Sequence, residues 1–193
     1  MKIKNAFLES TIALRQSTLD KFSTQLEVDL ALVFDLFRNV IEQGGKILIF
    51  GNGGSAAQAE HLSTELMVRF SADRNPIPAL CLTSSGVHLT AHANDFNFET
   101  LFARQIEALG TPNDLCLAFS TSGKSPNIIA AAKKASEKKI PFILCTGETE
   151  VDILKSLGVL TVSVPSRITA IIQEMHLIFL HILCEKIDSY LIK

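Results

Sequence analysis

The chain has 193 residues, of which 47% are hydrophobic and 20% are charged, and its formal net charge is −2 at pH 7. This length and composition are typical of one globular domain, and the small net charge argues against a nucleic-acid-binding protein, which usually has a basic face. The first residues lack the apolar centre of a signal peptide, and no run reaches 18 uninterrupted apolar residues, so no membrane partner is expected.

Helical and strand-like patterns alternate along the chain. Residues from about Ala6 to Gln43 have apolar side chains at helical spacing and predict two helices, the second ending at Gly44 and Gly45. Further helices are predicted for residues 55–70, with Ser55 near the N-cap, and for residues 86–110 (with a break around Asn94 and Asp95), 122–139, 151–158 and 169–191. Short apolar runs predict strands at Lys46–Phe50, Ile77–Thr83, Asp114–Thr121, Pro141–Gly147 and Val159–Pro165.

These alternating elements predict an α/β fold. The strands are apolar without clean alternation, as expected when helices cover both faces of a parallel sheet. We therefore expect a three-layer αβα sandwich with a five-stranded parallel sheet, N-terminal helices and a long C-terminal helix. No linker or change in composition divides the chain, so residues 1–193 are predicted to form a single domain.

The four cysteines are far apart and form no CxxC pair, so a structural zinc knuckle is not expected. Cys81, Cys116 and Cys145 lie in apolar, strand-like runs, where cysteine usually behaves as a small hydrophobic residue. This pattern suits a reducing compartment, and we expect a cytoplasmic protein.

Two strand-loop-helix units have loops suited to a sugar phosphate: "IFGNGGSAA" (Ile49–Ala57) and "AFSTSGKSPN" (Ala118–Asn127). In such sheets ligands bind beyond the carboxyl ends of the strands, where both loops would lie. Hydroxyl groups and the first N–H groups of a helix can hold a phosphate. The second loop supplies the hydroxyls of Ser120, Thr121, Ser122 and Ser125. The alternative is that both loops contain ordinary turn and cap residues. "GNGGS" matches neither the GxGxxG nor the Walker A pattern, so a dinucleotide or ATP site is not supported.

Two helices contain side chains that suit a metal ion. His61 and Glu65 are four residues apart and project from one helix face. A nitrogen–oxygen pair of this kind can bind Zn²⁺, although such pairs are also common on solvated helix faces. In the apolar C-terminal helix, Gln173 and His181 are about 80° apart around the axis, whereas His176 and His181 are about 140° apart. The spacing alone does not say which of these histidines is functional.

Four segments together resemble one known family: "GNGGSAAQAEHLSTEL", "ANDFNF", "STSGKSPN" and "IQEMHLIFLH". Over nearly its whole length the chain is similar to the phosphoheptose isomerases, bacterial proteins with a single sugar-isomerase (SIS) domain. The resemblance implies interconversion of sedoheptulose 7-phosphate and D-glycero-D-manno-heptose 7-phosphate through an enediol, the first step toward ADP- or GDP-heptose, for example for lipopolysaccharide. It also implies a cytoplasmic homotetramer with active sites at subunit interfaces, in which residues 1–45 pack in the oligomer.

The same resemblance implies roles for individual residues. One Zn²⁺ per subunit would be held by His61, Glu65, Gln173 and His181, with Glu65 and His181 as the catalytic acid and base. The sugar would be surrounded by Asn52, Gly53, Gly54, Ser55, Asn94 and Asp95, together with Glu65 and Gln173. The phosphate would contact Ser120, Thr121, Ser122 and Ser125, and Arg69 resembles a phosphate or interface arginine of the family.

The chain departs from the family pattern in two places. Ile171 stands where the family usually has an arginine before "IQE", a change that removes a charge at the start of the helix, and "TGETEVD" lacks a frequent glycine pair. Two alternatives are a non-catalytic SIS adaptor of the bacterial replication initiator and a SIS regulator that senses a sugar phosphate. The adaptor lacks equivalents of Glu65 and His181, which favours the isomerase.

Overall fold

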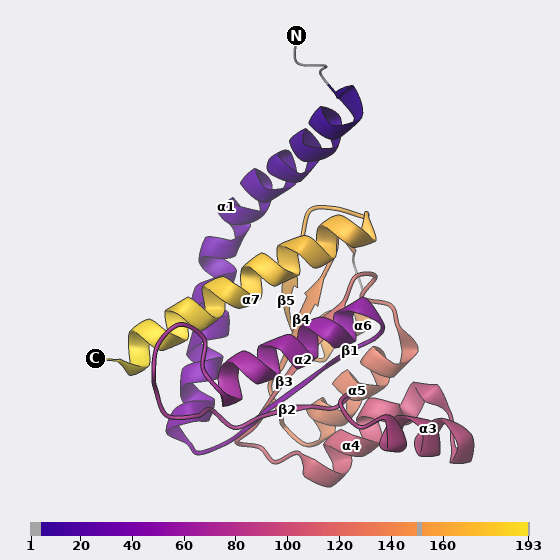
Figure 1. Cartoon of the computed structure of the whole chain (residues 1–193). Helices are drawn as coiled ribbons and strands as arrows, with labels where there is room; N and C mark the ends of the chain where they lie inside the picture. The colour runs from indigo at the N-terminus through magenta and orange to yellow at the C-terminus, as the bar shows by residue number, and fades with distance from the viewer. Residues whose placement is uncertain (1–4, 150–151, 193) are drawn as a thin grey trace.

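The computed structural model describes residues 5–149 and 152–192 and is built around one parallel sheet (Figure 1). The strands are β1 (Ile47–Gly51), β2 (Ala79–Cys81), β3 (Leu115–Ser120), β4 (Phe142–Thr146) and β5 (Leu160–Ser163). They pair in the order β2-β1-β3-β4-β5, and every pairing is parallel. The predicted five-stranded parallel sheet is confirmed.

The N-terminal helix α1 is continuous from Ala6 to Glu42. The prediction of two helices in this region was wrong, because the segment contains no glycine or proline that would break a helix. The helix begins at Asn5, whose side chain accepts a hydrogen bond from the Leu8 N–H at 3.2 Å. It ends before Gly44, which adopts a positive φ of +67°. Its first turns project away from the rest of the molecule (Figure 1).

The other helices are close to their predicted positions. They are α2 (Gly54–Met67), α3 (Gly86–Asp95), α4 (Leu101–Leu109), α5 (Pro126–Glu137), α6 (Asp152–Ser156) and α7 (Thr169–Leu191), with a 3₁₀ turn, η1, at Phe98–Thr100. The predicted break near Asn94 and Asp95 is confirmed, since α3 ends at Asp95. The helix predicted to continue to Phe70 ends at Met67 instead. Val151, where the short sixth helix was predicted to begin, lies outside the described residues.

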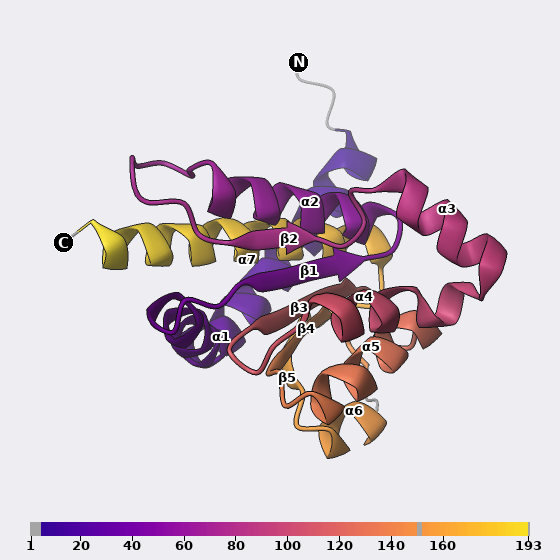
Figure 2. The ribbon, with the colours of Figure 1, turned by 90° about the horizontal axis from the view of Figure 1, so that it is seen from below.

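Two apolar layers flank the sheet, which confirms the αβα sandwich (Figure 2). Ile47, Ile49 and neighbouring side chains on one face pack against α1, α2 and α7. Leu48, Phe50 and others on the opposite face pack against α4, α5 and α6. Successive residues of a strand thus point into opposite layers. The side chains on both faces of the sheet are apolar because helices bury both faces. None of the helices in the described ranges is long and apolar enough to span a bilayer.

All four cysteines are buried and free. Burial raises the pKa of the thiols of Cys116, Cys145 and Cys184. Cys116 and Cys145 are therefore held as neutral, apolar groups, as the sequence predicted, and so is Cys184, which the prediction did not include.

Candidate active site

Helices α2 and α7 lie side by side (Figures 1 and 2). Three of the predicted side chains meet between them. The Nε2 atom of His61 lies 3.1 Å from a carboxylate oxygen of Glu65 on the same helix. It also lies 3.4 Å from Nε2 of His181 on α7. The ring of Phe70 packs against His181, with their centroids 5.6 Å apart. The structure thus selects His181 as the histidine that faces α2.

The contacts of His61 Nε2 with Glu65 and with His181 cannot both be ideal hydrogen bonds, because they share this one nitrogen. A ring nitrogen that carries a proton has no lone pair, and one that accepts a hydrogen bond carries no proton. If His61 Nε2 donates to Glu65, it cannot accept from His181. If it accepts from His181, an ionised Glu65 oxygen faces its lone pair. The tautomer of each histidine therefore decides which of the two contacts is a hydrogen bond. No three His, Cys, Asp or Glu side chains in the described ranges are arranged as a group that could hold a metal ion.

Gln173 lies on the same side of α7 as His181 but about two turns nearer the N-terminus. Its amide packs against Gly54 at the start of α2, where an added Cβ would lie 2.5 Å from Gln173 Nε2. Its backbone carbonyl accepts a hydrogen bond from the Gln58 side chain at 2.6 Å. The structure therefore places Gln173 beside the glycine loop, and its role as a metal ligand stays a prediction. Gln58 was not identified from the sequence.

The glycine loop follows β1 and begins α2. Gly53 adopts a φ of +56° and caps the helix, and Ser55 is buried two residues after this cap, near the N-cap as predicted. The side chain of Asn52 exchanges two amide hydrogen bonds, of 3.0 and 2.9 Å, with the buried Asn127 of α5. Asn52 and Gly53 line a cavity of about 280 Å³ with Glu60 and apolar neighbours. Asn127, which ties the two predicted loops together, was missed from the sequence because an asparagine one residue inside a helix carries no local signal.

The hydroxyl-rich loop lies between β3 and α5. Ser125 is the N-cap of α5 but makes no side-chain capping bond, and its hydroxyl is 3.5 Å from that of Ser120. Thr121 and Ser122 line a cavity of about 560 Å³, and Lys124 and Arg167 stand in its wall with Glu148, Thr149 and Ser166. Arg167 is paired with Glu148 at 3.2 Å, so the hydroxyls, Lys124 and the helix N-terminus are the groups that suit an anion. The two cations were not among the predicted residues.

Three other predicted residues lie elsewhere. Asn94 donates a hydrogen bond of 2.9 Å to Asp95 at the exposed end of α3. Asp95 lines a separate cavity of about 370 Å³, together with Phe96 and Arg104. Arg69 is exposed beyond the end of α2. Within one chain, Asp95 thus lines a different cavity from that of the glycine loop.

Two residues of α7 that the sequence left open belong to the core. His176 is fully buried, its Nε2 lies 3.3 Å from the carbonyl oxygen of Thr146, and its ring packs near Phe119. Burial lowers the pKa of His176 to about 4. Ile171 is also buried, so the family's usual charge is replaced here by an apolar core side chain. The unusual loop "TGETEVD" lies partly outside the described residues, at Glu150 and Val151.

Comparisons with known proteins identify the family and the fold. A family model described as SIS domain matches residues 12–147. The phosphoheptose isomerase of Shewanella pealeana is 40% identical over 192 residues, which cover 98% of this chain and 95% of that protein. A solved phosphoheptose isomerase from Francisella tularensis is 32% identical, with a TM-score of 0.89 and coverage of 94% of this chain and 96% of that one. One from Neisseria gonorrhoeae is 33% identical, with a TM-score of 0.87 and coverage of 94% and 97%.

Proposed function

The chain belongs to the SIS-domain family and, within it, to the phosphoheptose isomerases, and on this premise we propose that it interconverts sedoheptulose 7-phosphate and D-glycero-D-manno-heptose 7-phosphate. The observation that supports this most is the meeting of His61, Glu65 and His181. It brings a carboxylate and two imidazoles together between α2, which begins at the glycine loop, and α7.

The isomerisation moves a proton between C1 and C2 of the sugar through an enediol. It needs one group that takes a proton from carbon and one that protonates oxygen. Glu65 and His181 are the proposed acid/base pair, since a carboxylate and an imidazole can both exchange protons near neutral pH. The hydroxyls of the loop before α5 and the N-terminus of that helix would bind the phosphate. The glycine loop would let the sugar approach the backbone closely.

We further propose that the site holds Zn²⁺. Two nitrogens bound to one tetrahedral zinc lie about 3.4 Å apart, which is the distance between the ring nitrogens of His61 and His181. The three side chains do not form a ready-made group of metal ligands in the described ranges, so binding would have to bring Glu65 and Gln173 toward the two histidines. Glu65 and Gln173 would complete the ligand set. When bound, the metal would supply a Lewis acid that polarises the sugar's carbonyl and hydroxyl oxygens.

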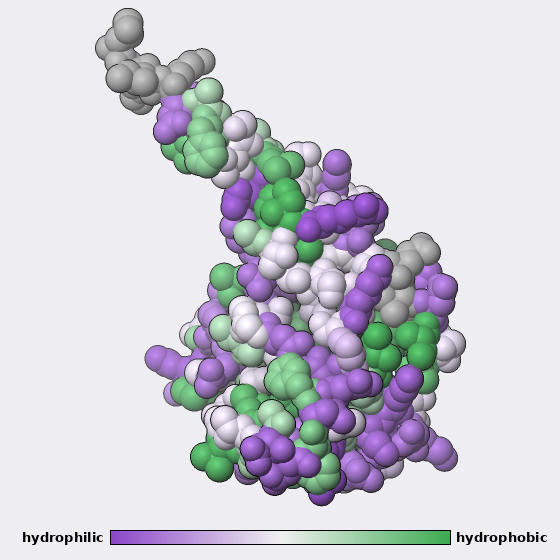
Figure 3. All heavy atoms as spheres, turned by 90° about the vertical axis from the view of Figure 1, so that its right-hand side faces the viewer, coloured by the Kyte–Doolittle hydropathy of each residue, from purple (hydrophilic) through white to green (hydrophobic). Residues whose placement is uncertain are grey.

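The exposed apolar surface of α1 supports assembly into the proposed cytoplasmic homotetramer. Phe7, Leu8, Ile12 and Leu14 are between 47% and 77% exposed on the projecting part of this helix (Figure 3). Adjacent apolar side chains at this level of exposure are typical of a surface that packs against another subunit. Active sites at subunit interfaces would explain why Asp95 lies apart from the glycine loop within one chain.

The function is tested by turnover of sedoheptulose 7-phosphate with the purified protein. Glu65→Gln and His181→Gln should each lower kcat by at least about 100-fold, the lower end for general acid–base groups. His176→Gln is the matched control, because it changes a histidine of the same helix that faces the core. Metal analysis should find about one zinc per subunit, and a chelator should abolish turnover. Full activity of both site variants would overturn the acid/base assignment, and a wild-type protein without turnover would overturn the proposed function.

A further inference from the structure

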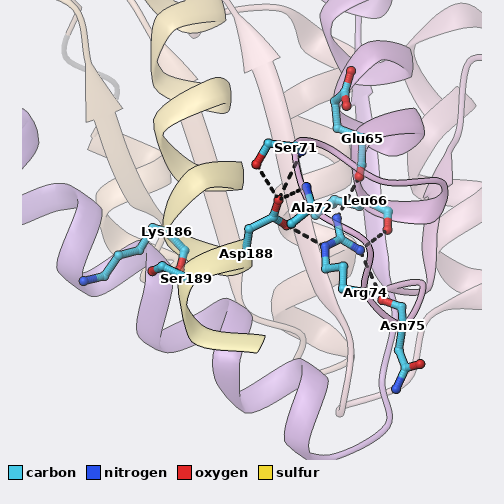
Figure 4. A network of polar contacts seen from close by, with 9 residues as sticks. All are labelled: Glu65, Leu66, Ser71, Ala72, Arg74, Asn75, Lys186, Asp188 and Ser189. Carbon is cyan, nitrogen blue, oxygen red and sulfur yellow. Dashed lines mark hydrogen bonds and ion pairs between the residues drawn. The ribbon is translucent and has the colours of Figure 1, made fainter. Parts of the chain in front are cut away.

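A buried arginine ties the end of α2 to α7 (Figure 4). The Nε atom of Arg74 donates to a carboxylate oxygen of Asp188 at 2.7 Å. Its Nη2 donates to the backbone carbonyl of Glu65 at 2.8 Å, and its Nη1 donates to that of Leu66 at 2.9 Å. The two charged side chains are only 1% and 5% exposed. This geometry uses the planar fork of arginine, which lysine does not have.

The carboxylate of Asp188 is fully engaged. Its second oxygen accepts hydrogen bonds from the Ser71 N–H, the Ser71 hydroxyl and the Ala72 N–H, at 3.1 to 3.2 Å. Burial alone would raise the pKa of Asp188, but the hydrogen bonds from Arg74, Ser71 and Ala72 hold it below its usual value. Both members of the pair are therefore charged at neutral pH. Such a pair resists displacement, because separating it would leave a buried charge without a partner.

The network also lies at the end of α2. In a longer helix, the carbonyls of Glu65 and Leu66 would accept hydrogen bonds from the N–H groups of Arg69 and Phe70. In this structure both carbonyls accept hydrogen bonds from Arg74 instead, and that of Leu66 also accepts one from the Ile77 N–H at 3.0 Å; α2 ends at Met67. The carboxylate of Glu65 points away from this network while its own carbonyl is held by it (Figure 4).

The same loop contacts the other helix of the site. Asp188 lies about two turns after His181 on nearly the same side of α7. Phe70, which precedes the residues that bind Asp188, packs against the His181 ring. Residues 68–75 are thus attached to α2 through the backbone carbonyl of Glu65 and to α7 through Asp188, and Phe70 of the same segment contacts His181.

We propose that Arg74 and Asp188 are positioning residues that hold Glu65 on α2 at a working distance from His181 on α7. The inference rests on the proposed function, because it assigns the pair to the acid/base residues of that reaction. A misplacement of about 1 Å can lower a rate by about 100-fold. If Arg74 and Asp188 did not hold residues 68–75, the end of α2 could shift. The distance between the side chains of Glu65 and His181 could then change by about 1 Å.

The chain contains a matched control for a purely structural role. Asp114 is also buried, and it accepts hydrogen bonds from Lys46 Nζ at 2.7 Å, from the Lys46 N–H at 2.9 Å and from Thr111. This network joins the residues just before β1 and β3, and it includes no residue of α2, of α7 or of the segment 68–75. Asp114→Asn and Asp188→Asn therefore remove the same charge from similar surroundings, but only Asp188 is bonded to the segment that contacts Glu65 and His181.

The experiment compares these two variants of the full chain with the wild type. Both should have a lower melting temperature. Only Asp188→Asn should lower kcat, by at least about 10-fold, with KM for sedoheptulose 7-phosphate within about two-fold of the wild type because the phosphate loop is untouched. Arg74→Lys should behave like Asp188→Asn, since a lysine cannot bind Asp188 and both carbonyls at once, and it serves as the second variant if Asp188→Asn does not fold.

A readout other than activity separates this inference from the proposed function. Crystal structures of Asp188→Asn, or Arg74→Lys, and of Asp114→Asn would give the distance between Nε2 of His61 and Nε2 of His181. The distance should increase in Asp188→Asn, or in Arg74→Lys, and should stay near the wild-type value in Asp114→Asn. If the wild type does not turn over the heptose phosphate, the proposed function fails, and this distance still decides the positioning role. An unchanged distance, or equal kcat in both aspartate variants, would show that Arg74 and Asp188 only stabilise the fold.

Discussion

Acid should destabilise this protein through one buried side chain, His176. Burial lowers the pKa of His176 to about 4 from an ordinary value of 6.5. Its Nε2 faces the carbonyl oxygen of Thr146, and its Nδ1 has no hydrogen-bond partner in the described part of the chain. A second proton on the ring would thus create a charge that nothing near Nδ1 accepts. Between pH 6.5 and 4 the unfolded chain binds this proton and the folded chain does not, so the free energy of unfolding falls as the pH falls.

The magnitude follows from the two pKa values. Each pKa unit corresponds to about 1.4 kcal/mol, so the complete effect is about 3 kcal/mol. Integrating over the two titrations, about 2 kcal/mol should be lost between pH 7 and pH 5. This is a sizeable part of the 5–15 kcal/mol that typically holds a protein of this kind together. Asp114 and Asp188, whose pKa values are lowered, should lose their contributions only below this window, near pH 4 and under.

The assay is urea unfolding of the wild type and His176→Gln at pH 7 and pH 5, at one protein concentration. Glutamine does not titrate and keeps an N–H donor for the Thr146 carbonyl. The wild type should lose about 2 kcal/mol more than the variant between the two pH values. Equal losses in the two proteins would refute the reasoning, because they would mean that His176 takes up its proton in the folded state.

Three further predictions concern the two loops and the edge of the sheet. Replacing Ser122 and Ser125 together by alanine should raise KM for the sugar phosphate while thermal unfolding stays near the wild type; an unchanged KM would reduce this loop to a helix cap. Gly54→Ala should lower activity sharply, because its Cβ would lie 2.5 Å from Gln173 Nε2 and displace that amide; turnover at the wild-type rate would argue against a role for the Gln173 position. Asp114→Asn should lower the free energy of unfolding by about 2 kcal/mol, the value of hydrogen bonds to a buried charge, with turnover unchanged; denaturant unfolding at pH 7 checks this, and a loss below about 0.5 kcal/mol would contradict it.

Local patterns in the sequence were enough to predict much of this fold. Continuous apolar runs of strand length mark strands that are covered on both faces, and the structure has all five of them in a parallel sheet. The long apolar segment at the C-terminus is a helix over the predicted residues, Thr169–Leu191. Helical spacing also predicted that His61 and Glu65 share a face, and they are in contact. These features depend on residues that are close together in the sequence, so the periodicity of apolar residues is sufficient to predict them.

Only the tertiary structure decided which distant side chains meet. His61 and His181 are in contact across 120 positions of sequence, and packing of α7 between α1 and α2 turned His181 toward α2 and His176 into the core. The role of Arg74 was equally hidden, since an arginine in a loop has no local pattern that indicates burial, and its partner Asp188 lies 114 positions away. The physical reason is the same in each case. Periodicity determines which face of an element is apolar, whereas the partner of a polar group depends on which element packs against that face.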